Sequence, residues 1–279
     1  MRGAIKAAVG DGLLTFMWIF CASSLGVLTL LVSSALGVAQ GLPTLAITTF
    51  LVFILLFIFG FIGDLLGGAT FNPTATAAFY AAGLGGPDSL ISAAIRFPAQ
   101  AAGAVGGALA ILEAMPIQYK HMLQGPSLKV DLHTGAIAEG VLTFVITLSV
   151  LIIVIRGPRS LIIKNLLLAM STVTLVVAGS GYTGPSMNPA NESTLSWQTL
   201  IDVFCVFDTI LKKDVLIWNS MVGGLVDAFG WAYVNNKHNT WEQFYVYWIC
   251  PFVGAILAAW VFRFLFPPPT TNQKKAKKA

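Results

Sequence analysis

Long runs without a charged residue alternate with short polar segments along this chain. No Asp, Glu, Lys or Arg occurs in Gly12–Gly63, and four later runs share this property: Phe97–Leu112, Gly140–Ile155, Asn165–Asn191 and Gln243–Phe262. A helix needs about 20 apolar residues to cross a bilayer, so the first run, split at Gln40-Gly41-Leu42-Pro43, holds two spans and the others hold four. The pattern predicts an all-α membrane protein with six spans: Ala8–Ser33, Ala46–Asp64, Leu90–Leu112, Gly135–Ile155, Leu161–Ser180 and Phe244–Phe266.

Charge is scarce, and its placement predicts an orientation in the membrane. Charged residues make up 10% of the chain and the net charge is +4. Lys and Arg gather before the first span, around the loop between spans four and five, and at the chain end: Arg2, Lys6, Arg156, Arg159, Lys164, Lys274, Lys275, Lys277 and Lys278. Cytoplasmic loops collect Lys and Arg, so we expect both termini to be cytosolic. These short flanks lack interleaved aromatic residues, so we expect a lipid bilayer and no nucleic acid as a partner.

The spans divide into two halves that repeat the same features. Each half has a carboxylate in its first span (Asp11, Glu139), an Asn-Pro pair after its second span (residues 72–73 and 188–189) and a Gly-Ala pair in its third span (103–104 and 254–255). Because each half has an odd number of spans, the two halves insert with opposite topology. We therefore divide the chain into a first inverted repeat (1–125), a second (126–267) and a basic cytosolic tail (268–279).

The second half is longer than the first. Asn72 and Gly103 are 31 residues apart, whereas Asn188 and Gly254 are 66 residues apart. We assign the surplus to an insertion at about 192–227, which carries seven charged residues and is too polar to span a membrane: Glu192, Asp202, Asp208, Lys212, Lys213, Asp214 and Asp227.

The two Asn-Pro pairs predict re-entrant half-helices. A proline is well placed in the first turn of a helix, because its missing N–H would be unpaired there. The two candidate boxes are Asn72, Pro73, Thr74 and Asn188, Pro189, Ala190. Two helix N-termini that meet near the bilayer midplane carry partial positive charge, and the Asn amides donate hydrogen bonds to a solute oxygen. Although a single Asn-Pro pair is more often a turn, two matched pairs favour a pore for water or another small neutral solute that excludes protons.

Asp11 and Glu139 are ionisable groups inside spans, which makes them candidate functional residues. One interpretation is a proton relay in a coupled transporter. The other, which their matched placement favours, is structural: each carboxylate accepts hydrogen bonds from the re-entrant backbone of its own half. We expect Asp11 to lie near the membrane edge, where exposure lowers the cost of its charge. The cysteines have no metal-like spacing, and we expect no metal, no cofactor and no enzymatic activity.

These residues resemble the aquaporins, or major intrinsic proteins. The resemblance rests on the two Asn-Pro boxes, the two carboxylates, Gln100 and the run Pro251-Phe252-Val253-Gly254-Ala255. The first box ends in Thr74, where Ala is usual, and the second is followed by Asn191, where Arg is usual. With its short N-terminus and Lys-rich tail, the chain is most similar to the plant small basic intrinsic proteins, first subgroup.

The resemblance implies an aquaporin-like bundle of six transmembrane helices plus two re-entrant half-helices, assembled as a homotetramer. It implies a luminal selectivity constriction formed by Val52, Val176, Pro185 and Asn191, a ring with little polarity. The final Lys275-Ala276-Lys277-Lys278-Ala279 fits a cytosolic retrieval signal, so we expect the protein in the endoplasmic reticulum. A basic tail that contacts anionic lipid is the alternative.

The insertion bears on whether the pore conducts. The insertion separates Asn191 from Ala228, which are adjacent in relatives. We interpret it as the product of a splice variant, or of a gene-model error in which intron sequence is translated. Apolar residues at helical spacing predict a substitute helix within it, at Trp197, Leu200, Ile201, Phe204, Phe207 and Leu211. The junction also creates the glycosylation sequon Asn191-Glu192-Ser193. We expect impaired conduction; the alternatives are a non-conducting regulatory subunit and a proton-coupled transporter.

Overall fold

The computed structural model describes residues 2–84, 90–123, 125–183 and 224–267. Every regular element in these ranges is a helix, and six helical stretches are long and apolar enough to cross a membrane. The helices are α1 (Arg2–Ser23), α2 (Leu25–Ala35), α3 (Leu42–Leu65), α4 (Pro73–Ala81), α5 (Leu90–Ala114), the 3-10 helix η1 (Ile117–Met122), α6 (Leu132–Arg156), α7 (Leu161–Gly179), α9 (Gly224–Val234), α10 (Trp241–Phe244), the π-helix η2 (Tyr245–Ile249) and α11 (Cys250–Leu265). The prediction of an all-α fold with six spans is confirmed.

The first span differs from its prediction in length and continuity. It begins at Arg2 rather than at Ala8, and it is broken into α1 and α2 at Ser24. There both the Ser24 N–H and the Ser24 hydroxyl donate to the Cys21 carbonyl, at 3.1 and 2.6 Å. A serine hydroxyl that bonds a preceding carbonyl competes with the regular helical pattern, which accounts for the break.

Proline and a π-turn shape the sixth span, which runs through α10, η2 and α11 without leaving the helical conformation. The Cys250 N–H bonds the Tyr245 carbonyl five residues back, and Pro251 in the next position has no N–H to give. Single π-turns of this kind often occur at functional positions in helices.

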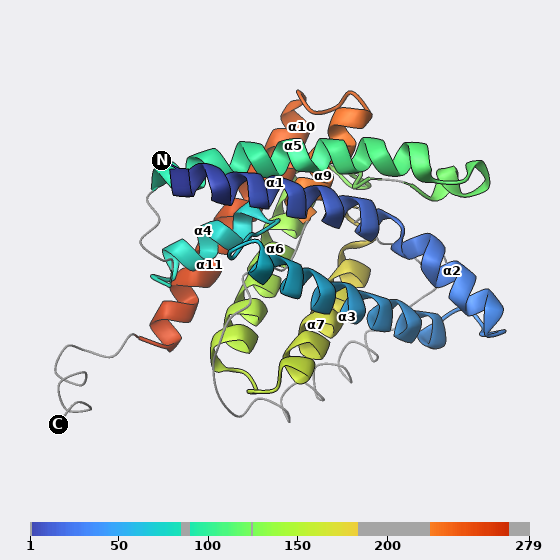
Figure 1. The fold of residues 1–279 in the computed structure, drawn as a ribbon, viewed down its shortest axis with the longest axis horizontal. Coiled ribbons are helices and arrows are strands. Elements are labelled where there is room, and N and C mark those ends of the chain that lie inside the picture. The colour runs from blue at the N-terminus through green and yellow to red at the C-terminus, as the bar shows by residue number, and fades with distance from the viewer. Residues whose placement is uncertain (1, 85–89, 124, 184–223, 268–279) are drawn as a thin grey trace.

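The packing of the helices reflects the two halves of the sequence. α1 lies along α5 in the first half, α6 lies along α11 in the second, and α3 of the first half packs against α7 of the second. Figure 1 shows these pairs side by side, with α4 between α1 and α11 and the first-half helices inclined to those of the second half. The core is therefore shared by both halves.

Matched glycines set the closest helix crossings. A Cβ at Gly103 of α5 would overlap the Gly12 carbonyl of α1, and a Cβ at Gly254 of α11 would overlap the Gly140 carbonyl of α6. Gly12 follows Asp11 just as Gly140 follows Glu139. The two crossings therefore occupy corresponding positions in the two halves, and small residues at such positions let membrane helices approach closely.

The start of α6 provides a test of a helix cap outside the membrane. The Thr134 N–H donates to Asp131 at 3.0 Å, and hydrogen bonds from the Thr134 backbone and hydroxyl hold the pKa of the Asp131 carboxyl below its ordinary value. The D131A variant should lower the midpoint of thermal unfolding in detergent, whereas D131N, which keeps an oxygen acceptor, should not.

The pH dependence of this cap has a defined sign. Because the folded-state pKa of Asp131 is depressed, its contribution to stability is complete above the unfolded value of about 3.9 and is lost as the pH falls through the folded-state pKa. The difference between D131A and the parent protein should therefore shrink on acidification. A difference that grows instead would contradict this account of the cap.

Candidate functional site

The first candidate box forms the N-terminus of a short buried helix. Asn72 is 1% exposed and caps α4, in which Pro73 is the first residue. The Asn72 Oδ1 atom accepts hydrogen bonds from the Thr74 N–H at 3.0 Å and from the Thr74 hydroxyl at 2.8 Å. Both bonds use the side-chain oxygen of Asn72, so its amide N–H groups point away from the cap that Thr74 completes. With nine residues, α4 is about 14 Å long, too short to cross a bilayer.

The loop before this helix is held by side chains from two spans. Asp11 of α1 accepts from the Thr70 N–H at 2.9 Å and from the Thr70 hydroxyl at 3.3 Å. Gln100 of α5 donates to Asp11 at 2.8 Å and to the Thr70 carbonyl at 3.0 Å. Thr70 lies two residues before Asn72, so these contacts restrain the backbone that leads into the box.

The surroundings of Asp11 correct one sequence-based expectation. Asp11 is 0% exposed rather than near an exposed membrane edge, and its charge is met by Arg96 of α5. The Arg96 Nε and Nη2 atoms donate to the two carboxylate oxygens at 2.7 and 2.9 Å. We did not identify Arg96 from the sequence, although a buried carboxylate in one span is a reason to search the neighbouring spans for a cation.

Aromatic packing supports the box from behind. Phe71 is fully buried and stacks on Trp18 of α1, with ring centroids 4.1 Å apart. Phe59 of α3 meets both rings edge-on, at 5.3 and 6.1 Å. Phe71, the residue before Asn72, is therefore packed between α1 and α3. The tip of α4 is held by aromatic packing on one side and by hydrogen bonds on the other.

The corresponding carboxylate of the second half has different neighbours. Glu139 of α6 is half-buried, and the Thr183 side chain lies beside its carboxyl group. Tyr247 of η2 donates to the Thr183 carbonyl at 3.2 Å. The second box, at Asn188, Pro189 and Ala190, lies outside the described residues, as does the substitute helix expected at 197–211.

A second short helix contacts the first. α9 packs against both α4 and α5, and a Cβ at Gly230 of α9 would come within 2.8 Å of the Ala104 carbonyl. With 11 residues, α9 is about 17 Å long and also too short to cross. It begins at Gly224, so the last residues of the stretch assigned to the insertion (224–227) form its first turn.

Two of the four constriction residues fall in the described part of the chain. Val52 of α3 is buried and Val176 of α7 is half-buried, on helices that pack against each other. Pro185 and Asn191 lie outside the described residues, so the ring as a whole remains a prediction.

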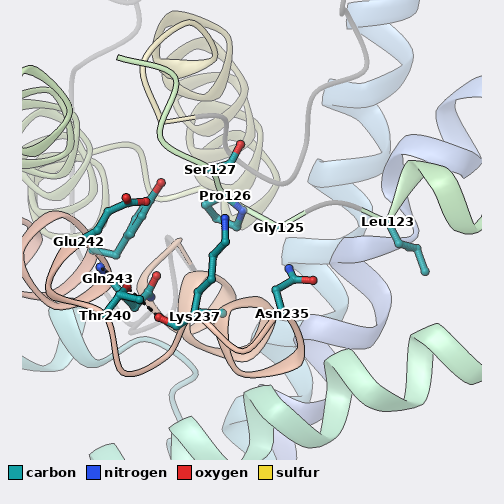
Figure 2. A pocket seen from close by; sticks show the side chains of 11 residues that line it. Leu123, Gly125, Pro126, Ser127, Asn235, Lys237, Thr240, Glu242 and Gln243 are labelled. Carbon is teal, nitrogen blue, oxygen red and sulfur yellow. Dashed lines mark hydrogen bonds between the residues drawn. The ribbon is translucent and has the colours of Figure 1, made fainter. Parts of the chain in front are cut away.

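A polar hollow of about 240 Å³ lies elsewhere, between the segment 123–127 and the chain from α9 to η2. Figure 2 shows the Lys237 side chain reaching toward Pro126 across this hollow, with Glu242 and Gln243 to one side and Asn235 to the other. Of the sequence-predicted site residues that the structure describes, none lines it. The hollow is therefore separate from the contacts that hold the Asn72 tip.

Six apolar spans and short buried helices define a polytopic membrane protein of the channel class. The chain belongs to the major intrinsic protein family, whose family model matches residues 2–262. As members of this family are channels, the chain is a passive membrane channel rather than an enzyme.

Individual relatives and one solved structure agree with this assignment. Aquaporin SIP1-1 of Oryza sativa subsp. japonica is 57% identical, with 99% of this chain and 98% of that protein covered. Aquaporin SIP1-1 of Arabidopsis thaliana is 48% identical over the full length of both. The fold is similar to the X-ray structure of the aquaglyceroporin from Plasmodium falciparum, with a TM-score of 0.59, 14% identity and coverage of 95% of this chain and 98% of that one.

Proposed function

We propose that this channel passes water or another small neutral solute along a path that the tips of the two short helices border. The observation that carries this proposal is the buried N-terminus of α4, capped by Asn72 and held by groups from α1 and α5. A helix that starts inside a membrane protein is tolerated where it is buried in protein or lines a wet cavity. The contact between α4 and α9 supports a meeting of the two halves at this level.

The chemistry of the site favours neutral solutes. The N-terminus of α4 carries partial positive charge, and the bonds that Asn72 Oδ1 accepts from Thr74 orient the amide as a donor. A solute oxygen can accept a hydrogen bond from such an amide, whereas a cation is repelled by the helix end. By the family resemblance, we assign the same roles to Asn188, Pro189 and Ala190, and the constriction to Val52, Val176, Pro185 and Asn191.

A structural role for Asp11 and Glu139 fits better than proton carriage. A proton carrier has to release and rebind its proton in each cycle, whereas both Asp11 oxygens accept short hydrogen bonds from Arg96 and from the box loop. This arrangement favours a carboxylate that stays bound to the loop backbone. We extend the same role to Glu139.

We also propose a cellular setting for the channel. The Lys and Arg clusters favour cytosolic termini, and the Lys-rich tail favours retention in the endoplasmic reticulum. A homotetramer is proposed from family membership. Cross-linking of the protein in native membranes tests the tetramer. Co-localisation of the protein with an endoplasmic-reticulum marker, before and after the substitutions Lys275→Ala and Lys277→Ala, tests the retention signal.

Replacement of Asn72 by Asp separates helix capping from solute binding. Asp caps a helix as well as Asn does, so the folded protein should be retained, but the amide donor is lost and a negative charge is added. We expect osmotic water permeability of reconstituted vesicles to fall by about tenfold, equivalent to ~1.4 kcal/mol in barrier height, and cation leak to rise.

Two further variants control this experiment, which stopped-flow light scattering follows. N72A removes both the cap and the donor, and should lower both stability and flux. N236D places the same carboxylate at an exposed position after α9 and should leave flux unchanged. Parental water permeability in N72D would refute the proposed role of the amide.

A further inference from the structure

The two halves of the fold hold their buried carboxylates in different ways. Asp11 faces Arg96, whose guanidinium bonds both carboxylate oxygens in a two-pronged geometry. The Arg96 Nε atom and the Asp11 Oδ2 atom form an ion pair 2.7 Å long. Arg96 lies seven residues before Gly103, and the residue seven before the matching Gly254 is Tyr247. The corresponding place in the second half therefore holds an uncharged phenol, which bonds the Thr183 carbonyl instead.

Arg96 also reaches the loop that carries the box. Its Nη2 atom donates to the Thr70 hydroxyl at 3.2 Å and lies 3.4 Å from the Gly68 carbonyl. Gly67 and Gly68 have φ of +80° and +84°, a conformation that glycine adopts without strain and that leaves the free loop with many alternatives. External contacts are therefore needed to select one conformation of the segment before Asn72.

In the part of the chain that the structure describes, the groups that bind the Asp11 carboxylate are Thr70, Gln100 and one cation, Arg96. From α1 itself, Thr15 bonds the Asp11 backbone carbonyl, and from the loop only Thr70 bonds its carboxylate. Gln100 of α5 bonds the carboxylate but is uncharged. The charged residue of α3, Asp64, lies at the end of that helix and is exposed. α2 and the part of α9 from Ala228 onward contain no charged residue. Removal of Arg96 therefore leaves a fully buried carboxylate without a cation, which is strongly unfavourable.

We propose that Arg96 is a positioning residue of the pore: by neutralising Asp11 and binding Thr70 and Gly68, it fixes the loop that aims Asn72. The inference rests on the proposed function. In the first half, the position of the box loop then depends on the matched charges of Asp11 and Arg96. In the second half, the place that corresponds to Arg96 holds no arginine. The channel is thus electrostatically asymmetric about its repeat axis.

The test uses the full-length chain with the substitutions R96Q, D11N and D11N/R96Q. Water permeability is measured per folded protein in vesicles, and hydrogen–deuterium exchange is followed over residues 66–76. R96Q should leave the buried Asp11 carboxylate without its arginine, and D11N should remove the charge that Arg96 binds. Each should lower permeability per folded channel by at least about fivefold and speed exchange in this segment. The double variant, which buries no charge, should return both quantities to within about twofold of the parent.

The outcomes separate this inference from the proposed function. Exchange over 66–76 reports the position of the loop even if the parent protein does not conduct. Normal permeability per folded channel in R96Q, with only the yield reduced, would overturn the positioning role, as would a double variant no better than R96Q. If R96Q does not fold, the double variant decides: parental exchange supports charge matching, and accelerated exchange overturns it. As a matched control, E139Q should leave exchange over 66–76 unchanged.

Discussion

A chain that lacks residues 192–227 should conduct water at least about tenfold faster than the full-length chain, a difference of ~1.4 kcal/mol in barrier height. The deletion joins Asn191 directly to Ala228, so that the helix that starts at the second box would continue into the segment that packs on α5. In the full-length chain the helix α9 instead begins at Gly224, in a turn supplied by the extra stretch. The second box and the packed segment are thereby separated in sequence.

Stopped-flow swelling of vesicles that contain equal amounts of either protein measures this difference. A third protein, in which 192–227 are replaced by a Gly/Ser linker of the same length, should remain slow, because separation rather than composition is the cause. Glycosidase sensitivity at Asn191 provides a second readout, since a modified Asn191 cannot lie inside a pore. Equal permeability of the full-length and shortened proteins would show that the extra residues leave the path open.

Substitution of Gly103 or Gly254 by Ala should destabilise the protein by about 3 kcal/mol. The new methyl group would overlap the Gly12 carbonyl in one case and the Gly140 carbonyl in the other. Backbone cannot yield as the end of a flexible side chain can, so the paired helices have to separate. The two variants should behave alike, because each places its methyl group against the backbone of the neighbouring helix.

Thermal unfolding in detergent, followed by light scattering or by helical circular dichroism, measures this effect. Gly3→Ala is a matched control in α1, since a Cβ at Gly3 meets nothing within 4 Å and alanine favours a helix. Midpoints of G103A and G254A equal to that of G3A would show that the helix pairs do not approach as closely as described. Because the crossings lie beside Asp11 and Glu139, both variants should also lower permeability.

More of the fold than of the site could be predicted from the sequence. The spans could be located because a bilayer demands a long uncharged run, which is a local property of the chain. The start of α4 at Pro73 could be predicted because a proline after a capping residue restricts the backbone within a few residues. The correspondence of Asp11 with Glu139 and of Gly103 with Gly254 followed from the same internal repeat.

The ion pair of Asp11 with Arg96, the break at Ser24 and the start of α9 at Gly224 were not predicted. Each depends on which groups meet in space. Arg96 is 85 residues from Asp11 along the chain, and only the close packing of α1 on α5 brings them together. The sequence by itself determined which stretches are long and apolar enough to cross a membrane and where the short helix α4 begins, because both are local properties of the chain. Only the tertiary structure decided which cation neutralises the buried carboxylate, because burial and distance arise when helices pack.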